Sequence, residues 1–231
     1  MNSKPVIRNE TTADIEAISE VTIVAFKTLD VSNQTKHFII EALRAANSLT
    51  LSLVAEVGGR VVAHIAFSPV TMSDGTRDWY GLGPVSVLPE VQHQGIGTAL
   101  IQEGLSRLKH FKAAGCCVVG HPEYYRKFGF ENVPELTIEG VPPEVFFALA
   151  FQGSTPHGTI TFHEGFKADG QPERAGNSLQ CPLKLRLGAR QAAMKTKAKI
   201  LQIEHCSCHC EGTVKLFCRR FAIAFSGRKR V

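Results

Sequence analysis

Gln92-His93-Gln94-Gly95-Ile96-Gly97 is the stretch that decides how this chain folds, because it stands between a predicted strand and a predicted helix. The apolar run 83–88 precedes it, and residues 98–108 place leucine and isoleucine along one side of a helix. A strand that enters a glycine-rich turn and then a helix points backbone N–H groups at one place, together with the positive end of the helix. Gly95 and Gly97 have no Cβ, so a phosphate can approach the backbone closely. The stretch therefore predicts a phosphate-binding turn.

Two common phosphate-binding motifs fit this turn poorly. The dinucleotide-binding motif Gly-x-Gly-x-x-Gly needs a third glycine, but residue 100 is leucine. That motif also opens an early strand–helix–strand unit, whereas this turn lies in mid-chain after a predicted hairpin. A P-loop needs Gly-Lys followed by Ser or Thr, and the chain has no such triplet. The sequence thus favours another class of phosphate ligand.

The first 168 residues have the pattern of a mixed α/β domain. Glycines 58 and 59 separate two predicted strands, which is typical of a hairpin. The order of predicted elements is β-α-α-β-β-β-α-β-α-β, which indicates a mixed sheet with helices. The periodicity predicts helices over 11–25, 38–46, 98–108 and 123–128, and strands over 6–8, 49–57, 60–67, 79–88, 116–119 and 145–151.

Composition divides the chain near residue 168. Residues 1–168 hold 13 Lys and Arg against 17 Asp and Glu, whereas residues 169–231 hold 13 against 4. Most cysteines also lie in the second part, and residues 167–172 (KADGQP) have the composition of a linker. We therefore expect a domain over 5–168 and a basic, Cys-rich C-terminal extension over 169–231, poor in regular structure.

The bulk composition favours a cytoplasmic enzyme. The hydrophobic content of 44% is enough for one full core. No apolar run approaches the roughly 18 residues of a membrane span. The first residues, MNSKP, have no apolar segment typical of a signal peptide.

Two separate motifs carry a resemblance to a known family. Residues 83–100 (GPVSVLPEVQHQGIGTAL) contain the pattern (Gln/Arg)-x-x-Gly-x-(Gly/Ala), and residues 125–130 (YRKFGF) contain Tyr-x-x-x-Gly-Phe. In this order, separated by one helix and one strand, they resemble the acyl-CoA-binding elements of the GNAT family of N-acetyltransferases, and within it a small bacterial subgroup. The resemblance covers about 5–168. It implies an α/β fold with a mixed, mostly antiparallel central sheet flanked by helices.

The resemblance implies that acetyl-CoA is the cosubstrate and that two segments hold it. The strand before the turn would pair its backbone with the pantetheine arm through Val85, Ser86 and Val87. The turn and the start of the helix would surround the pyrophosphate with N–H groups, aided by the helix dipole. The residues implied in this second role are Gln92, His93, Gln94, Gly95, Ile96, Gly97 and Thr98. No metal is expected.

The implied reaction is direct attack of an acceptor amine on the thioester. A backbone N–H near Val87 would polarise the carbonyl, and Tyr125 would protonate the leaving thiolate, because a phenol with a pKa near 10 stays protonated at neutral pH. Tyr124 is the neighbouring alternative, since adjacent helical residues point about 100° apart and only one can face the site. A non-catalytic acyl-CoA sensor or regulatory module could use the same turn.

Several residues near these motifs are less clearly assigned. The family often has an asparagine upstream of the motif tyrosine, but this chain has GHPE at 120–123, so His121 is a base, a CoA contact or a surface residue. Trp79 and Tyr80 line an acceptor pocket or fill the core. Residues 116–117 (CC) lie in an apolar run and are expected to be buried and unreactive. The motifs identify neither the general base nor the acceptor, a small-molecule or peptide amine.

The C-terminal part suggests two further partners, neither of which we expect. Residues 205–210 (HCSCHC) are rich in metal ligands, but alternating Cys-x-Cys-x-Cys places them too close for a usual tetrahedral zinc site. The basic run 227–231 could attract nucleic acid, but no RNA-binding motif accompanies it. Residues 190–203 could form a helix. A homodimer is the default oligomer.

Overall fold

The computed structural model describes residues 4–27, 35–153 and 155–170. The predictions about zinc, nucleic acid and a helix over 190–203 fall on residues 171–231 and lie outside the described residues. Within the described ranges, none of the helices combines the length and hydropathy that a bilayer crossing requires.

A mixed sheet organises the described residues, with the hydrogen-bonded order β1-β2-β3-β4-β5-β7. The pairing of β4 with β5 is parallel, and the other neighbours on this path are antiparallel. The predicted mixed, mostly antiparallel sheet is therefore confirmed. The strands are β1 (Val6–Asn9), β2 (Leu51–Val57), β3 (Arg60–Met72), β4 (Trp79–Val87), β5 (Gly115–Val119) and β7 (Phe146–Ala150).

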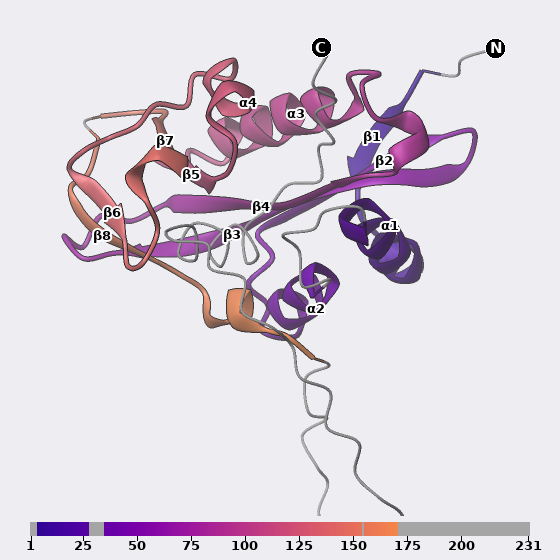
Figure 1. Cartoon of the computed structure of the whole chain (residues 1–231), viewed down its shortest axis with the longest axis horizontal. Coiled ribbons are helices and arrows are strands. Elements are labelled where there is room, and N and C mark those ends of the chain that lie inside the picture. The colour runs from indigo at the N-terminus through magenta and orange to yellow at the C-terminus, as the bar shows by residue number, and fades with distance from the viewer. Residues whose placement is uncertain (1–3, 28–34, 154, 171–231) are drawn as a thin grey trace, which may run out of the picture. The chain divides into compact units, whose positions relative to one another are not determined.

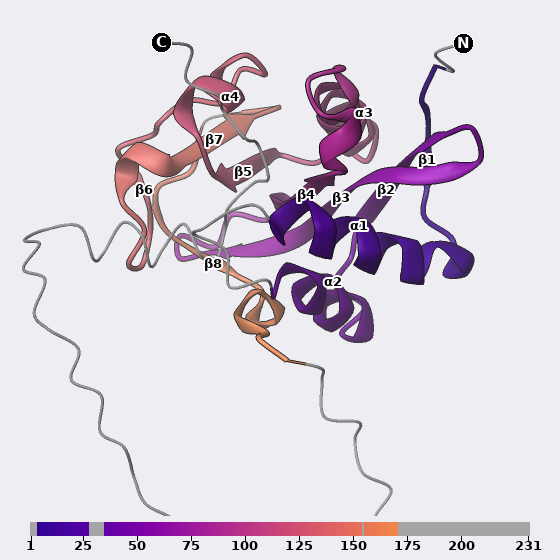
Figure 2. The same cartoon turned by 45° about the vertical axis from the view of Figure 1, so that its right-hand side comes forward.

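Two short strands were missed by the sequence prediction. Strand β6 (Leu136–Ile138) pairs in parallel with β8 (Gly158–Phe162). Strand β8 in turn runs antiparallel to the end of β3, where Val70 lies opposite Phe162 (Figure 2). These strands are held by distant partners, so the local sequence pattern carries little signal for them.

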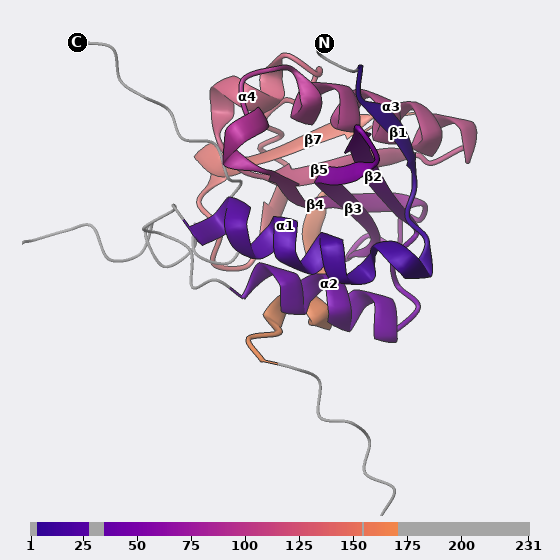
Figure 3. The ribbon, with the colours of Figure 1, turned by 90° about the vertical axis from the view of Figure 1, so that its right-hand side faces the viewer.

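Helices cover both faces of the sheet (Figures 1 and 3). On one face lie α1 (Ile15–Lys27) and α2 (Lys36–Ala45), and on the other lie α3 (Ile96–His110) and the short α4 (Pro122–Arg126). The described residues also form four 3-10 turns, namely η1 (Thr12–Asp14), η2 (Pro89–Val91), η3 (Pro143–Val145) and η4 (Glu164–Lys167). Helix α3 starts two residues before the predicted position, at Ile96, and α4 ends two residues before it, at Arg126, which is the usual scatter of helix boundaries.

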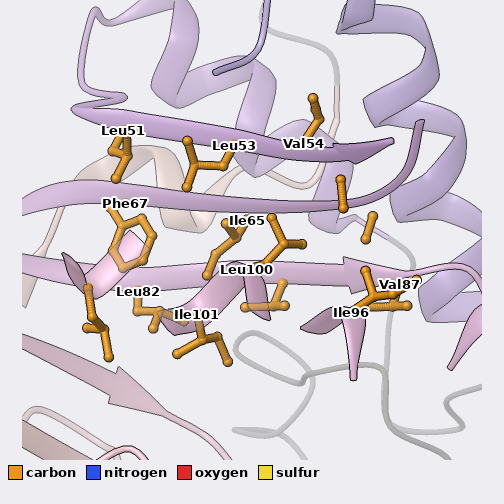
Figure 4. Packing of buried hydrophobic residues seen from close by; sticks show 14 of the residues in the cluster. Leu51, Leu53, Val54, Ile65, Phe67, Leu82, Val87, Ile96, Leu100 and Ile101 are labelled. Atoms are coloured by element: carbon orange, nitrogen blue, oxygen red, sulfur yellow. The ribbon is translucent and has the colours of Figure 1, made fainter. Parts of the chain in front are cut away.

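The predicted hairpin of β2 and β3 is confirmed. Gly58 and Gly59 join the strands with φ angles of 59° and 81°, which suit a tight hairpin turn. Alternate residues of the hairpin then face α3, and Figure 4 shows Leu53, Ile65 and Phe67 packed against Leu100 and Ile101 of that helix. These five side chains are completely buried. This layer fixes the position of α3 on the sheet.

Strand β4 leaves β5 soon after the two strands meet. They pair only from Trp79 to Gly81, opposite Gly115 to Cys117. The register of β4 against β3 then shifts between Leu82 and Val85, around the cis peptide Gly83–Pro84. Beyond the shift, β4 keeps its pairing with β3 but has none with β5 in the described chain. The second half of β4 therefore carries a backbone edge that β5 does not pair.

Candidate functional site

The hydrogen-bond ladder between β3 and β4 decides which backbone groups lie on this unpaired edge. The N–H of Leu88 donates to the carbonyl of Val62 (3.0 Å), so these opposite residues form a hydrogen-bonded pair. Such pairs alternate along an antiparallel ladder. Ser86 is therefore bonded to β3, whereas Val85 and Val87 point their N–H and C=O groups away from β3, toward the side that β5 has left.

The side chain of Gln92 forms a hydrogen bond with one of these outward backbone groups. Its Nε2 donates to the carbonyl oxygen of Val87 at 3.0 Å. The N–H of Val87 points to the same side as this carbonyl, because both groups of a strand residue share one edge. The first residue of the glycine turn thus holds the last residue of β4. The resemblance implied phosphate binding by Gln92, and this contact with Val87 was not predicted.

Ser86 is placed differently from its two neighbours. Its side chain is fully buried, and its Oγ lies 3.0 Å from Oγ1 of Thr22 on α1. The hydroxyl therefore links β4 to α1, which lies on the face of the sheet away from α3 (Figure 3). Of the three residues expected to contact pantetheine, only Val85 and Val87 direct backbone groups toward the unpaired edge.

The glycine turn ends at the start of α3. His93 and Gly95 both have positive φ angles, 62° and 83°. Gly95 is the N-cap of α3, and a Cβ built on it would meet nothing within 4 Å. His93, Gln94 and Gly95 are exposed, whereas Ile96 and Gly97 are buried.

This turn leaves a cluster of N–H groups at the end of a 15-residue helix. The N–H groups of the first helical turn, here those of Ile96, Gly97 and Thr98, have no acceptor within the helix. No side chain caps the helix at Gly95 either. Free N–H groups and the positive end of the helix dipole favour an anion at this place.

The two adjacent tyrosines of α4 separate, as their helical spacing predicts. Tyr125 is fully buried, with its ring edge-on to Phe130 (5.7 Å between centroids). Burial, then the nearby Tyr124 and the thiol of Cys116 raise the pKa of Tyr125 well above the ordinary value. Its hydroxyl has no hydrogen-bond partner among the described residues. A phenol in this environment stays protonated.

Tyr124 is directed elsewhere. Burial raises its pKa, and a hydrogen bond with Thr98 partly offsets this effect. Tyr124 therefore belongs to the surroundings of the α3 N-terminus, whereas Tyr125 lies near Cys116 of β5.

The structure decides several of the interpretations that the sequence left open. Trp79 is a core residue with 2% of its surface exposed, and a Cβ on Gly115 would lie only 2.4 Å from its ring. Tyr80 is partly exposed, and His121 is exposed at the start of α4. Both cysteines of residues 116–117 are buried free thiols, and burial raises the pKa of each, which agrees with the expected lack of reactivity. No cluster of three or more potential metal-binding side chains occurs in the described part of the chain.

A buried polar network was missed altogether. The imidazole of His64 on β3 has no exposed surface and lies 2.7 Å from the hydroxyl of Ser52. Ser52 bonds to Glu10, which also accepts two hydrogen bonds of 3.0 Å from Arg44. A lone histidine in the apolar run 61–67 was the available signal.

Comparison with known proteins was consistent with this geometry. Residues 48–132 match the family described as "Acetyltransferase (GNAT) domain". The curated "Uncharacterized N-acetyltransferase YhbS" of Escherichia coli K12 is 37% identical over 94 residues, which are 40% of this chain. The match spans about half, 56%, of that protein.

Two solved structures are similar to this chain over nearly their whole length. A GNAT family acetyltransferase from Brucella melitensis, crystallised in complex with acetyl-CoA, is 45% identical, with a TM-score of 0.64 over 71% of this chain and 98% of that one. YhbS from Escherichia coli in complex with CoA is 26% identical, with a TM-score of 0.66 over 74% of this chain and 96% of that one.

Proposed function

The chain belongs to the GNAT family of acetyltransferases, and on this premise we propose that it transfers the acetyl group of acetyl-CoA to an amine of a small-molecule or peptide acceptor. The parting of β4 from β5 beside the glycine turn of α3 is the observation that carries the proposal. It offers an unpaired strand edge and an anion-binding helix end next to each other. The relative from Brucella melitensis supports the choice of cofactor, because it was crystallised with acetyl-CoA.

Acetyl-CoA presents one chemical group to each part of this site. The amides of its pantetheine arm extend β4 as an added strand would, pairing with the outward backbone groups of Val85, while the N–H of Val87 stays available to the thioester carbonyl. Its pyrophosphate accepts hydrogen bonds from the N–H groups of the segment 92–98. Ser86 contributes by anchoring β4 to Thr22, which keeps the edge in place.

The acetyl transfer then needs an electrophilic carbonyl and a proton for the leaving sulfur. The amine nitrogen of the acceptor attacks the thioester carbon, and the N–H of Val87 stabilises the oxyanion. The C–S bond breaks, and Tyr125 donates its phenolic proton to the departing thiolate. The proton released by the new amide nitrogen balances the one that Tyr125 gives. The raised pKa of Tyr125 keeps the phenol protonated until the thiolate forms.

The substitution Tyr125→Phe tests the acid role. It removes only the hydroxyl, which has no hydrogen-bond partner among the described residues, so we expect the fold to be kept. Turnover should fall on the order of 10²-fold, while the Kd for acetyl-CoA stays within about twofold because the pantetheine and pyrophosphate contacts remain. The measurements are free-thiol release with a panel of amines and isothermal titration with acetyl-CoA.

The outcomes separate three cases. Unchanged turnover in the Tyr125→Phe variant rules out this residue as the acid. Binding of acetyl-CoA by the wild type without transfer to any amine supports the alternative of a non-catalytic acyl-CoA sensor. Failure of the wild type to bind acetyl-CoA overturns the proposed function itself.

A further inference from the structure

Lys127 reaches the same helix end from the other side. It follows α4, and its Nζ donates a hydrogen bond of 3.2 Å to Oγ1 of Thr98, in the first turn of α3. The ammonium group also lies 3.9 Å from the centre of the Tyr124 ring and 5.0 Å from that of Phe128. Both distances are within the range of cation–π interactions. Two aromatic faces and a hydroxyl thus hold one positive charge beside the glycine turn.

This position is electrostatically unfavourable for a cation. The N-terminus of a helix carries a partial positive charge, and lysines are normally favourable at the opposite end. Loss of hydration against the rings lowers the pKa of Lys127. No carboxylate of the described residues forms an ion pair with it within 4.0 Å. Two positive features therefore meet with no negative partner, and an anionic ligand would stabilise both.

We propose that Lys127, held by Tyr124 and Thr98, binds the diphosphate of the acyl carrier and makes the protein select CoA thioesters over thioesters that lack this diphosphate. The inference rests on the proposed function, because it assigns a ligand group to a residue at the same site. On binding, the ammonium exchanges its bond to the Thr98 hydroxyl for one to a phosphate oxygen. The Tyr124 ring keeps the flexible lysine stem in place, which reduces the entropy lost on binding.

The substitution Lys127→Met keeps the unbranched stem and removes the charge. Lys127 is exposed, so the fold should be unaffected. Lys109→Met is the matched control, because Lys109 is in the last turn of α3 and its Nζ lies 5.3 Å from the ring centre of Phe151. The control also removes one lysine charge that contacts a ring, but at the C-terminal end of α3, whereas Lys127 contacts its N-terminal end.

Isothermal titration with three probes measures the role of Lys127. For CoA and for dephospho-CoA, which lacks the 3′-phosphate, we expect Lys127→Met to raise the Kd about tenfold or more, and Lys109→Met to change it less than twofold. For S-acetylpantetheine, which has no phosphate, we expect all three proteins to bind equally. The wild-type Kd for CoA should also rise with salt more steeply than that of Lys127→Met.

Each other result has a definite meaning. A wild type that binds CoA as tightly as Lys127→Met does overturns this inference and leaves the proposed function standing. A loss seen with CoA but not with dephospho-CoA also overturns it, because the lysine would then serve the 3′-phosphate. An equal loss of CoA affinity in Lys109→Met would mean that the effect comes from net charge, which contradicts the assignment of Lys127 to the diphosphate. A wild type that binds no CoA overturns the proposed function, and this inference falls with it.

Discussion

Single residues in the buried network have their protonation fixed by their neighbours. The Glu10 carboxylate can only accept hydrogen bonds, so the hydroxyl of Ser52 donates to it. The oxygen of Ser52 must then accept from Nε2–H of His64 at 2.7 Å. This leaves the lone pair of His64 on Nδ1, which is buried and has no hydrogen-bond partner among the described residues. Burial lowers the pKa of His64, which keeps the ring neutral.

The substitution Glu10→Gln tests this network through its pH dependence. Burial raises the pKa of Glu10, but the imidazole of His64, whose Nε2 lies 3.7 Å away, and hydrogen bonds from Arg44 and Ser52 more than offset this and bring the pKa to about 2, against an ordinary 4.5. A lowered folded-state pKa contributes stability above about 4.5 and loses it as the pH falls toward about 2. At pH 7, we expect the variant to be about 1–3 kcal/mol less stable.

Urea unfolding followed by circular dichroism at several pH values measures this effect. The free energy of unfolding of the wild type should approach that of Glu10→Gln as the pH falls from about 4.5 to about 2. Glu16→Gln on the exposed side of α1 serves as the control and should follow the wild type. A constant difference between wild type and Glu10→Gln over this range would contradict the assigned contacts.

At the scale of elements, local sequence patterns predicted helices and hairpins better than they predicted the pairing of distant strands. The hairpin and α3 were predicted because glycine turns and apolar periodicity are local signals. The separation of β4 from β5 goes with a shift in the pairing register between β3 and β4. Local sequence does not encode such a shift. Helical spacing predicted that only one of Tyr124 and Tyr125 faces the site, but the neighbours of the two rings, Thr98 for Tyr124 and Cys116 for Tyr125, come from distant elements.

The contact of α3 with the sheet predicts an unusual effect of Gly104→Ala. Alanine normally stabilises a helix by about 1 kcal/mol relative to glycine. Here a Cβ on Gly104 would lie 2.4 Å from ring carbons of Phe67, which is completely buried. We expect overpacking to prevail and to lower stability by about 1–3 kcal/mol, measured by urea unfolding.

A double-mutant cycle with Phe67→Leu separates packing from helix propensity. Leucine removes the ring, so Gly104→Ala should be clearly less destabilising in the Phe67→Leu background than in the wild type. Equal effects in both backgrounds would mean that α3 does not lie as close to β3 as the structure has it.

At the scale of the whole molecule, the composition change near residue 168 lies just after a buried cluster of the described residues. The turn η4 places Phe166 against Ile39 and Leu43 of α2, and these three side chains form a small buried cluster. The domain assignment over 5–168 therefore remains a proposal with a structural rationale, since the last buried cluster among the described residues closes just before the proposed boundary.

Two truncations test this boundary. A chain ending at Ala168 keeps the Phe166 cluster and removes 13 basic against 4 acidic residues, so we expect an unchanged Tm and an unchanged Kd for acetyl-CoA. A chain ending at Phe162 also removes Phe166, which should destabilise the fold by about 3–5 kcal/mol, as a buried Phe→Ala change does. Thermal unfolding and isothermal titration measure both effects. If the chain ending at Ala168 unfolds or loses acetyl-CoA binding, residues 169–231 are part of the functional domain and the boundary is wrong.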